Sequence, residues 1–194
     1  MGSNEYAPVQ TDHLLWQLLQ MNHEDGLKKL VDKYFSPLQN YGYKFVRDQD
    51  FVKDCVQEVF IELWHRRDRL STPDSVRAYL LSSVRQRVLR QGYRQRIGRK
   101  EESPNLENDI NFADFSPEWS MIEEESVSET AKRVADSLNL LPKRQREVIY
   151  LRYYQNLERH EIAEVMGVNP QSVSNLLQVA FKTFREHWTG FIFP

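Results

Sequence analysis

The stretch from Arg159 to Arg185 constrains this chain more than any other, because its spacing fits two short helices that cross at a tight turn. Gly167 lies four residues after the small residue Ala163, and a glycine there lets the chain turn sharply. Asn169 and Pro170 form a helix start, since Asn caps free amides and Pro at the first helical position loses no hydrogen bond. The apolar residues expected to fill the seam are Ile162, Met166, Val168, Val173 and Leu176.

This pattern is typical of a helix-turn-helix that reads duplex DNA. A two-helix corner inside an ordinary bundle gives a similar pattern, so the surrounding sequence has to distinguish the two. The second helix carries no Arg or Lys between Pro170 and Phe181. We therefore expect weak duplex binding by this segment alone.

The composition favours a mostly helical protein without disulfides. Only 7 Gly and 8 Pro occur among 194 residues, and the single cysteine, Cys55, is surrounded by apolar residues and is expected to fill a core. No run approaches the roughly 18 apolar residues of a membrane span, and the polar N-terminal sequence lacks a signal-peptide core. A cytoplasmic location without membrane insertion is expected.

Helical spacing of apolar residues divides the chain into two domains. From Asp12 to about Arg96 the spacing predicts a bundle of about four helices, and it resumes near Met121 for about four more. Residues 98–120 have little periodicity and many acidic residues. The expected fold class is all-α: small helical domains at residues 1–97 and 121–194, the second containing the helix-turn-helix, joined by an acidic flexible linker at residues 98–120.

Charge is strongly segregated along the chain. Residues 65–100 carry eleven basic and two acidic residues, whereas residues 101–130 carry ten acidic and no basic residues. Arg87, Arg90 and Arg94 fall on one helix face beside Tyr93, which combines phosphate-pairing charge with a ring that can stack on an unpaired base. A solvated charged face is the alternative, but the absence of acidic residues from this helix favours a nucleic-acid contact.

A second candidate surface lies on the preceding predicted helix, whose sequence is DFVKDCVQEVFIELWHRR. One side is apolar, and the other presents Asp54, Gln57 and Glu58. The residues alone leave two interpretations open: a protein contact, or an ordinary solvated helix face.

Three motifs in order resemble the extracytoplasmic-function (ECF) sigma factors of bacterial RNA polymerase, members of the sigma-70 family. They are VKDCVQEVFIELWHRR, the Arg-rich helix after YLLSSVRQRV, and LPKRQREVIYLRYYQNLERHEIAEVMGVNPQSVSNLLQVAFKTFRE, with an acidic linker before the last. The likeness runs from about Asp12 to Trp188. It implies an alternative sigma factor that binds core RNA polymerase and directs promoter-specific initiation.

The resemblance also implies roles for individual residues. Polymerase binding, at the clamp coiled coil, falls on Asp54, Gln57 and Glu58, and the flap region is a further expected polymerase contact. Contacts with the melted promoter -10 element fall on Arg66, Arg67, Arg69, Arg77, Arg85, Gln86, Arg87, Arg90, Tyr93 and Arg94. Contacts with the -35 duplex fall on Gln171, Ser172, Ser174, Asn175, Gln178 and Lys182. An anti-sigma factor is an expected partner, and the acidic linker either threads the polymerase RNA exit path or serves as a soluble tether.

The chain departs from the family pattern at Gln86, Arg90 and Gly92. Because Gly costs about 1 kcal/mol of helix propensity, the Arg-rich helix is expected to end or bend near Gly92. These departures leave one alternative open: a sigma-like protein that occupies polymerase or an anti-sigma factor without opening promoters. A stand-alone helix-turn-helix regulator is disfavoured, because it would give the Arg-rich helix and the face of Asp54, Gln57 and Glu58 no purpose. No enzymatic activity, metal or cofactor is expected, because the histidines lack metal-ligand spacing and no Gly-rich phosphate loop occurs.

Overall fold

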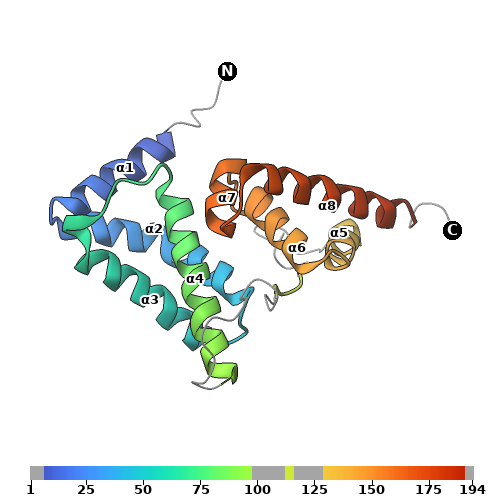
Figure 1. Cartoon of the computed structure of the whole chain (residues 1–194), viewed down its shortest axis with the longest axis horizontal. Coiled ribbons are helices and arrows are strands. Elements are labelled where there is room, and N and C mark those ends of the chain that lie inside the picture. The colour runs from blue at the N-terminus through green and yellow to red at the C-terminus, as the bar shows by residue number, and fades with distance from the viewer. Residues whose placement is uncertain (1–6, 98–111, 116–128, 191–194) are drawn as a thin grey trace. The chain divides into compact units, whose positions relative to one another are not determined.

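All regular secondary structure in the described residues is helical. The computed structural model describes residues 7–97, 112–115 and 129–190, and it divides into two units, Met1–Leu106 and Glu107–Pro194 (Figure 1). An all-α chain with two helical units confirms the predicted fold class.

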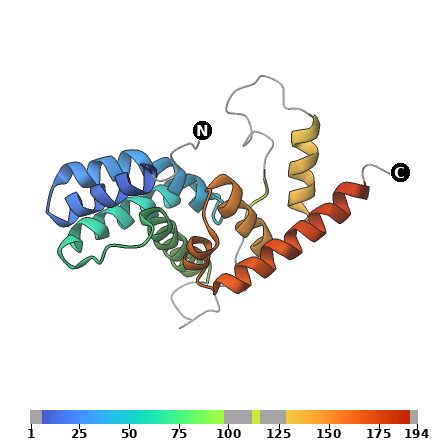
Figure 2. The same ribbon diagram turned by 90° about the horizontal axis from the view of Figure 1, so that it is seen from above.

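Four long helices form the first unit. They are α1 (Ala7–Gln20), α2 (Glu24–Tyr43), α3 (Gln49–His65) and α4 (Val76–Ile97), with a 3-10 turn, η1 (Arg67–Arg69), after α3. Helices α1 and α2 lie side by side in both views (Figures 1 and 2). The core shared by the four helices includes Trp16, Leu19, Leu30, Leu38, Tyr41, Val56, Leu80 and Val84, each at most 1% exposed.

Polar side chains set the starts of α3 and α4. Asp48 Oδ1 accepts a hydrogen bond from the Phe51 amide at 3.0 Å, and Ser75 Oγ accepts one from the Ala78 amide at 3.2 Å. Each bond satisfies an amide that has no partner within the first helical turn. These caps mark where α3 and α4 begin.

Glycines permit close packing of helices and loops in the first unit. A Cβ on Gly26 would lie 2.7 Å from both Leu15 O and Leu19 N, so this glycine lets the α1 and α2 backbones touch. A Cβ on Gly92 would lie 3.2 Å from Val46 Cγ2. The expectation that α4 ends near Gly92 is wrong: the helix continues to Ile97, and buried Gly92 makes room for the loop before α3.

The second unit packs shorter helices around α8. They are α5 (Glu129–Asn139), α6 (Lys143–Ile149), α7 (Arg159–Met166) and α8 (Pro170–Gly190), and a π-helical turn, η3 (Tyr150–Tyr154), extends α6. The turn closes with the Gln155 amide donating to Tyr150 O at 3.1 Å. The helix that follows Pro142 therefore ends in a widened turn.

The helix-turn-helix forms where the sequence predicts it. Gly167 adopts φ 65° and ψ 37°, the left-handed conformation that favours glycine, and Asn169 Oδ1 accepts from the Ser172 amide at 2.7 Å. Ile162, Met166 and Val173 are fully buried in the seam, whereas Val168 and Leu176 are half-buried. Glu158 replaces the usual Ser or Thr cap, and its amide donates to Glu161 Oε2 at 2.7 Å.

A short piece of the expected linker packs on the second unit. Phe112 and Phe115 are 1% and 3% exposed, and their rings contact Tyr150 and Tyr154 of η3. The Asn139 side chain accepts from the Phe115 amide at 2.7 Å and donates to Phe115 O at 2.9 Å. Residues 112–115 therefore belong structurally to the second unit. The rest of the acidic linker lies outside the described residues.

Candidate protein and nucleic-acid interfaces

The exposed face of α3 carries the three predicted polymerase-binding residues together. Asp54, Gln57 and Glu58 follow one another at spacings of three and one, and all three are exposed. Their neighbours Cys55, Val56 and Val59 face the core and are buried. The helix therefore separates an apolar packing face from a solvent-facing polar face that a partner protein can reach.

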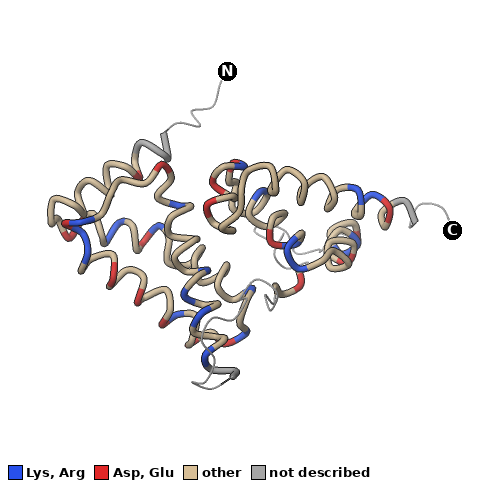
Figure 3. Tube along the Cα trace, in the orientation of Figure 1, with Lys and Arg blue, Asp and Glu red and all other residues tan. Residues whose placement is uncertain are grey.

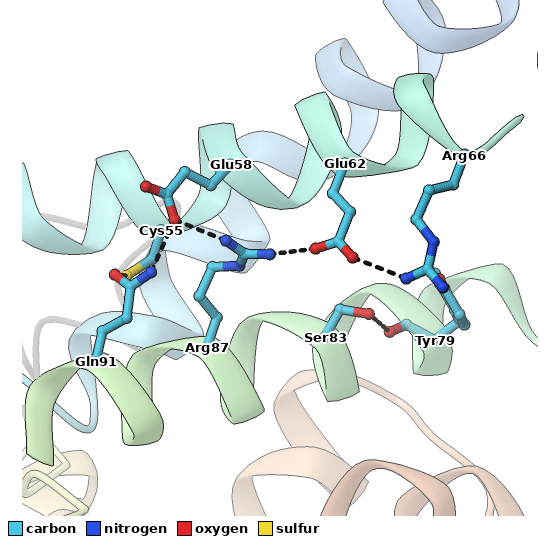
Figure 4. Close-up of polar contacts among 8 residues, drawn as sticks. All are labelled: Cys55, Glu58, Glu62, Arg66, Tyr79, Ser83, Arg87 and Gln91. Carbon is cyan, nitrogen blue, oxygen red and sulfur yellow. Dashed lines mark hydrogen bonds and ion pairs between the residues drawn. The ribbon is translucent and has the colours of Figure 1, made fainter. Parts of the chain in front are cut away.

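A ladder of charged side chains joins α3 to α4 (Figure 4). Arg87 Nη1 donates to Glu58 Oε2 at 2.7 Å, and Arg87 Nη2 donates to Glu62. Glu62 Oε1 in turn accepts from Arg66 Nη1 at 2.8 Å. A residue predicted to contact polymerase thus pairs directly with one predicted to contact DNA, which the separate motifs did not indicate.

Gln91 continues the ladder toward the core. Its Nε2 donates to Glu58 Oε2 at 2.8 Å, and this bond, with the Arg87 guanidinium, lowers the pKa of Glu58 below its ordinary range. Cys55 Sγ lies 3.4 Å from Gln91 Oε1. Burial, together with the Glu58 carboxylate, raises the pKa of the Cys55 thiol to about 11, so the thiol is a protonated core group.

The predicted -10 residues separate into exposed and packed side chains. Arg85 is 6% exposed, and its guanidinium lies 5.9 Å from the centre of the Phe45 ring. The Arg67 guanidinium stacks on Trp64 at 4.2 Å and donates to Asn22 Oδ1 at 2.6 Å. Arg77, Arg87 and Tyr93 are half-buried. The exposed members of the set are Arg66, Arg69, Gln86, Arg90 and Arg94.

In the first unit, α3 carries mostly acidic positions and α4 carries basic ones. Figure 3 shows acidic positions spaced along α3 and basic positions along α4. The Arg87 ladder lies where the two helices meet, so part of the opposite charge is paired across their contact. The exposed cations of α4 and of the preceding loop remain as a surface for a polyanion.

The predicted -35 residues lie at the start of α8. Gln171, Asn175 and Gln178 are exposed, and Gln171 Nε2 donates to Asn175 Oδ1 at 3.1 Å. Ser172 and Ser174 are half-buried, and Ser174 Oγ donates to Pro170 O at 3.2 Å. Lys182 is exposed two turns further on. Asn and Gln side chains of this kind can make bidentate hydrogen bonds to adenine.

Two groups of structural contacts were not predicted from the sequence. Phe112, Phe115 and Asn139 fasten part of the acidic stretch to the second unit, and two aromatic residues within acidic sequence were the available signal. Polar residues of α1 contact the loop before α4, and no local pattern indicates so distant a contact. In the described ranges, no three metal-ligating side chains gather, and no helix is long and apolar enough to cross a membrane.

Comparison with known proteins agrees with this arrangement. Residues 30–97 match the family described as sigma-70 region 2, and residues 131–184 match sigma-70, region 4. The chain is 25% identical to the RNA polymerase sigma factor SigZ of Bacillus subtilis, covering 81% of this chain and 82% of SigZ. It is 26% identical to the ECF RNA polymerase sigma factor BldN of Streptomyces coelicolor, covering 84% of this chain and 61% of BldN.

A solved structure shares the fold. The sigma factor RpoE, in a co-crystal structure with the anti-sigma factor NepR from Bartonella quintana, superposes with a TM-score of 0.57 at 15% identity, covering 84% of this chain and 96% of RpoE.

Two helical units that match regions 2 and 4 in this order define a sigma factor. The chain belongs to the ECF sigma factors of the sigma-70 family, non-enzymatic alternative sigma factors that direct transcription initiation with RNA polymerase.

Proposed function

We propose that this sigma factor docks on the clamp coiled coil of core RNA polymerase through Asp54, Gln57 and Glu58. The observation that carries the proposal is their joint exposure on one face of α3, beside the basic α4. Gln91 and Arg87 lower the pKa of Glu58 and hold its carboxylate in place, so it presents a positioned negative charge to a basic partner. We also propose a contact between the polymerase flap and the second unit.

For the melted -10 element, we propose contacts by the exposed residues of the loop and of α4. These are Arg66, Arg69, Gln86, Arg90 and Arg94, with half-buried Tyr93 as a stacking platform. Guanidinium groups hold the strand backbone, and a ring can stack on an unpaired base. Arg67, Arg85 and Arg87 are assigned instead to packing within the unit, because Arg67 stacks on Trp64, Arg85 is buried and Arg87 pairs with α3. Half-buried Arg77 stays among the proposed -10 contacts.

For the -35 duplex, we propose that the start of α8 enters the major groove, with Gln171, Asn175 and Gln178 toward the bases. Ser172, Ser174 and Lys182 would contact the phosphate backbone. Since α8 has no cation before Lys182, the free chain is expected to bind -35 duplex weakly. Tethering to polymerase raises the effective concentration of this unit at the promoter.

We further propose a cytoplasmic location and an anti-sigma partner. RpoE, which shares the fold, was solved with the anti-sigma factor NepR, and this supports an equivalent partner here. Co-purification of the tagged full chain from its own cells tests the partner. Recovery of polymerase alone, with no second stoichiometric protein under any growth condition, would argue against it.

Run-off transcription with core polymerase on genomic promoters tests the proposed promoter contacts. Specific transcripts support them, and core binding without transcripts supports the alternative of a sigma-like protein that does not open promoters.

Core-binding affinity tests the proposed docking surface on α3. Glu58→Gln and Gln57→Ala should weaken core binding. Asp32→Asn, an exposed acidic position on α2, is the matched control and should behave as wild type.

A further inference from the structure

The loop between α3 and α4 runs along α1 (Figure 1). Residues 70–73 form no regular secondary structure, so their carbonyl groups need partners from elsewhere. Three α1 side chains provide them. Gln20 Nε2 donates to Leu70 O at 2.6 Å, Trp16 Nε1 donates to Ser71 O at 3.2 Å, and His13 Nε2 lies 3.0 Å from Pro73 O.

These contacts form a matched register between a helix and an extended segment. From His13 to Gln20 a helix rises about 10.5 Å, because each residue adds about 1.5 Å. An extended chain covers about 10 Å in the three steps from Leu70 to Pro73. The two segments run antiparallel, so the carbonyls at 70, 71 and 73 meet donors at 20, 16 and 13 in order. Such a match holds the loop backbone along its length rather than at one point.

The α1 support is itself fixed within the unit. Asp12 accepts from Lys33 Nζ at 2.6 Å and from Tyr34 Oη, both on α2. Trp16 is fully buried, and its ring makes an edge contact with Tyr79 of α4 at 5.2 Å. The match to sigma-70 region 2 begins at residue 30, so α1 precedes the matched segment.

The clamped loop keeps its polar side chains at the surface. Ser71, Thr72 and Asp74 are exposed, while the backbone on the other side is bonded to α1. Thr72 Oγ1 also lies 3.4 Å from Gln20 Oε1. An enzyme or factor that captures an extruded base reads it through hydrogen bonds at fixed positions, so a fixed loop backbone favours discrimination between bases.

We propose that α1 is a positioning element for base selection at the -10 element, acting through His13, Trp16 and Gln20 on the backbone of residues 70–73. The inference rests on the proposed -10 contacts of Arg66 and Arg69, and extends them to residues 70–73 of the same loop. It adds residues far away in sequence as determinants of promoter specificity. None of them touches DNA in this scheme.

The test uses holoenzyme formed from the full chain and core polymerase, with a single-stranded DNA pool randomised over the -10 segment. Gln20→Met removes both Gln20 bonds at nearly constant shape, and Trp16→Phe removes the indole donor but keeps a ring. Gln17→Met makes the same chemical change as Gln20→Met at an exposed α1 position and is the control. Sequencing the bound pool gives base preferences, and titration with core polymerase gives docking affinity.

We expect Gln20→Met and Trp16→Phe to reduce base preference about three- to tenfold, the range that losing one or two such hydrogen bonds supports. Core affinity should stay at the wild-type value, and Gln17→Met should match wild type throughout. Unchanged base preference in folded Gln20→Met and Trp16→Phe would overturn the inference, as would a loss that only parallels weaker core binding. Thermal unfolding shows whether each variant is folded. If Gln20→Met is not folded, the base preference of Trp16→Phe decides whether the inference holds. A wild-type holoenzyme without base preference would instead refute the proposed role of the loop.

Discussion

Arg87 of α4 bridges Glu58 and Glu62 of α3 with one guanidinium group. The contact joins the face proposed for polymerase to the helix proposed for promoter DNA. Both ion pairs are partly exposed, so Arg87 braces α4 against α3 at the edge of that face.

Replacing Arg87 should weaken the first unit moderately. Arg87→Met leaves Glu58 and Glu62 facing each other, and the pairs are partly exposed, so we expect a loss of about 1 kcal/mol in unfolding free energy. Chemical denaturation measures it. A double-mutant cycle with Glu62→Gln should show non-additive effects, whereas strictly additive losses would mean that the ladder carries no coupling.

The acid stability of the first unit should depend on Glu58. Its folded pKa is lowered below the ordinary 4.5 by Gln91 and Arg87, so its stabilisation is present above pH 4.5 and is lost as the pH falls through the folded pKa. Melting temperatures measured from pH 6 to pH 3 should fall less steeply in Glu58→Gln than in wild type. Parallel curves for the two proteins would refute this assignment.

Cys55 should be inert to thiol reagents in the folded protein. Its pKa of about 11, against an ordinary 9.0, keeps the thiol protonated at neutral pH, and the side chain is fully buried. Its contribution to stability is present below pH 9 and is lost as the pH rises toward 11. Alkylation at pH 8 should follow unfolding, with labelling accelerated by denaturant. Fast labelling of native protein would contradict the burial.

Gly26 and Gly92 should respond differently to alanine. Gly26→Ala places a Cβ against the α1 backbone and should cost about 2 kcal/mol, because two helices have to separate. In Gly92→Ala, a propensity gain of about 1 kcal/mol offsets a tight contact with the Val46 side chain, so the net change should be small. Denaturation midpoints measure both. Equal losses at the two sites would contradict the packing.

Asn139 should hold residues 112–115 on the second unit. Asn139→Leu removes two hydrogen bonds to Phe115 and should cost about 1 to 2 kcal/mol. Limited proteolysis should then cut near Phe115 faster than in wild type. Asp136→Asn, at an exposed α5 position, is the control and should leave the cleavage rate unchanged. Cleavage that is equally slow in Asn139→Leu would mean that the aromatic contacts alone hold the segment.

Local sequence predicts much of this protein because helix starts, turns and apolar spacing act over a few residues. The turn at Gly167, the cap at Asn169 and the exposed trio Asp54, Gln57 and Glu58 all follow from short-range rules. Gly92 does not, because its role depends on Val46, which approaches it only in the folded unit.

The sequence by itself therefore determined the helices, the two units and the family, since periodicity and motifs are properties of neighbouring residues. Only the tertiary structure decided which arginines are exposed, that Arg87 pairs with Glu58 and Glu62, and that α1 clamps the loop at residues 70–73. Those contacts join residues 25 to 60 positions apart. The packing of whole helices sets such distances, and no local pattern records them.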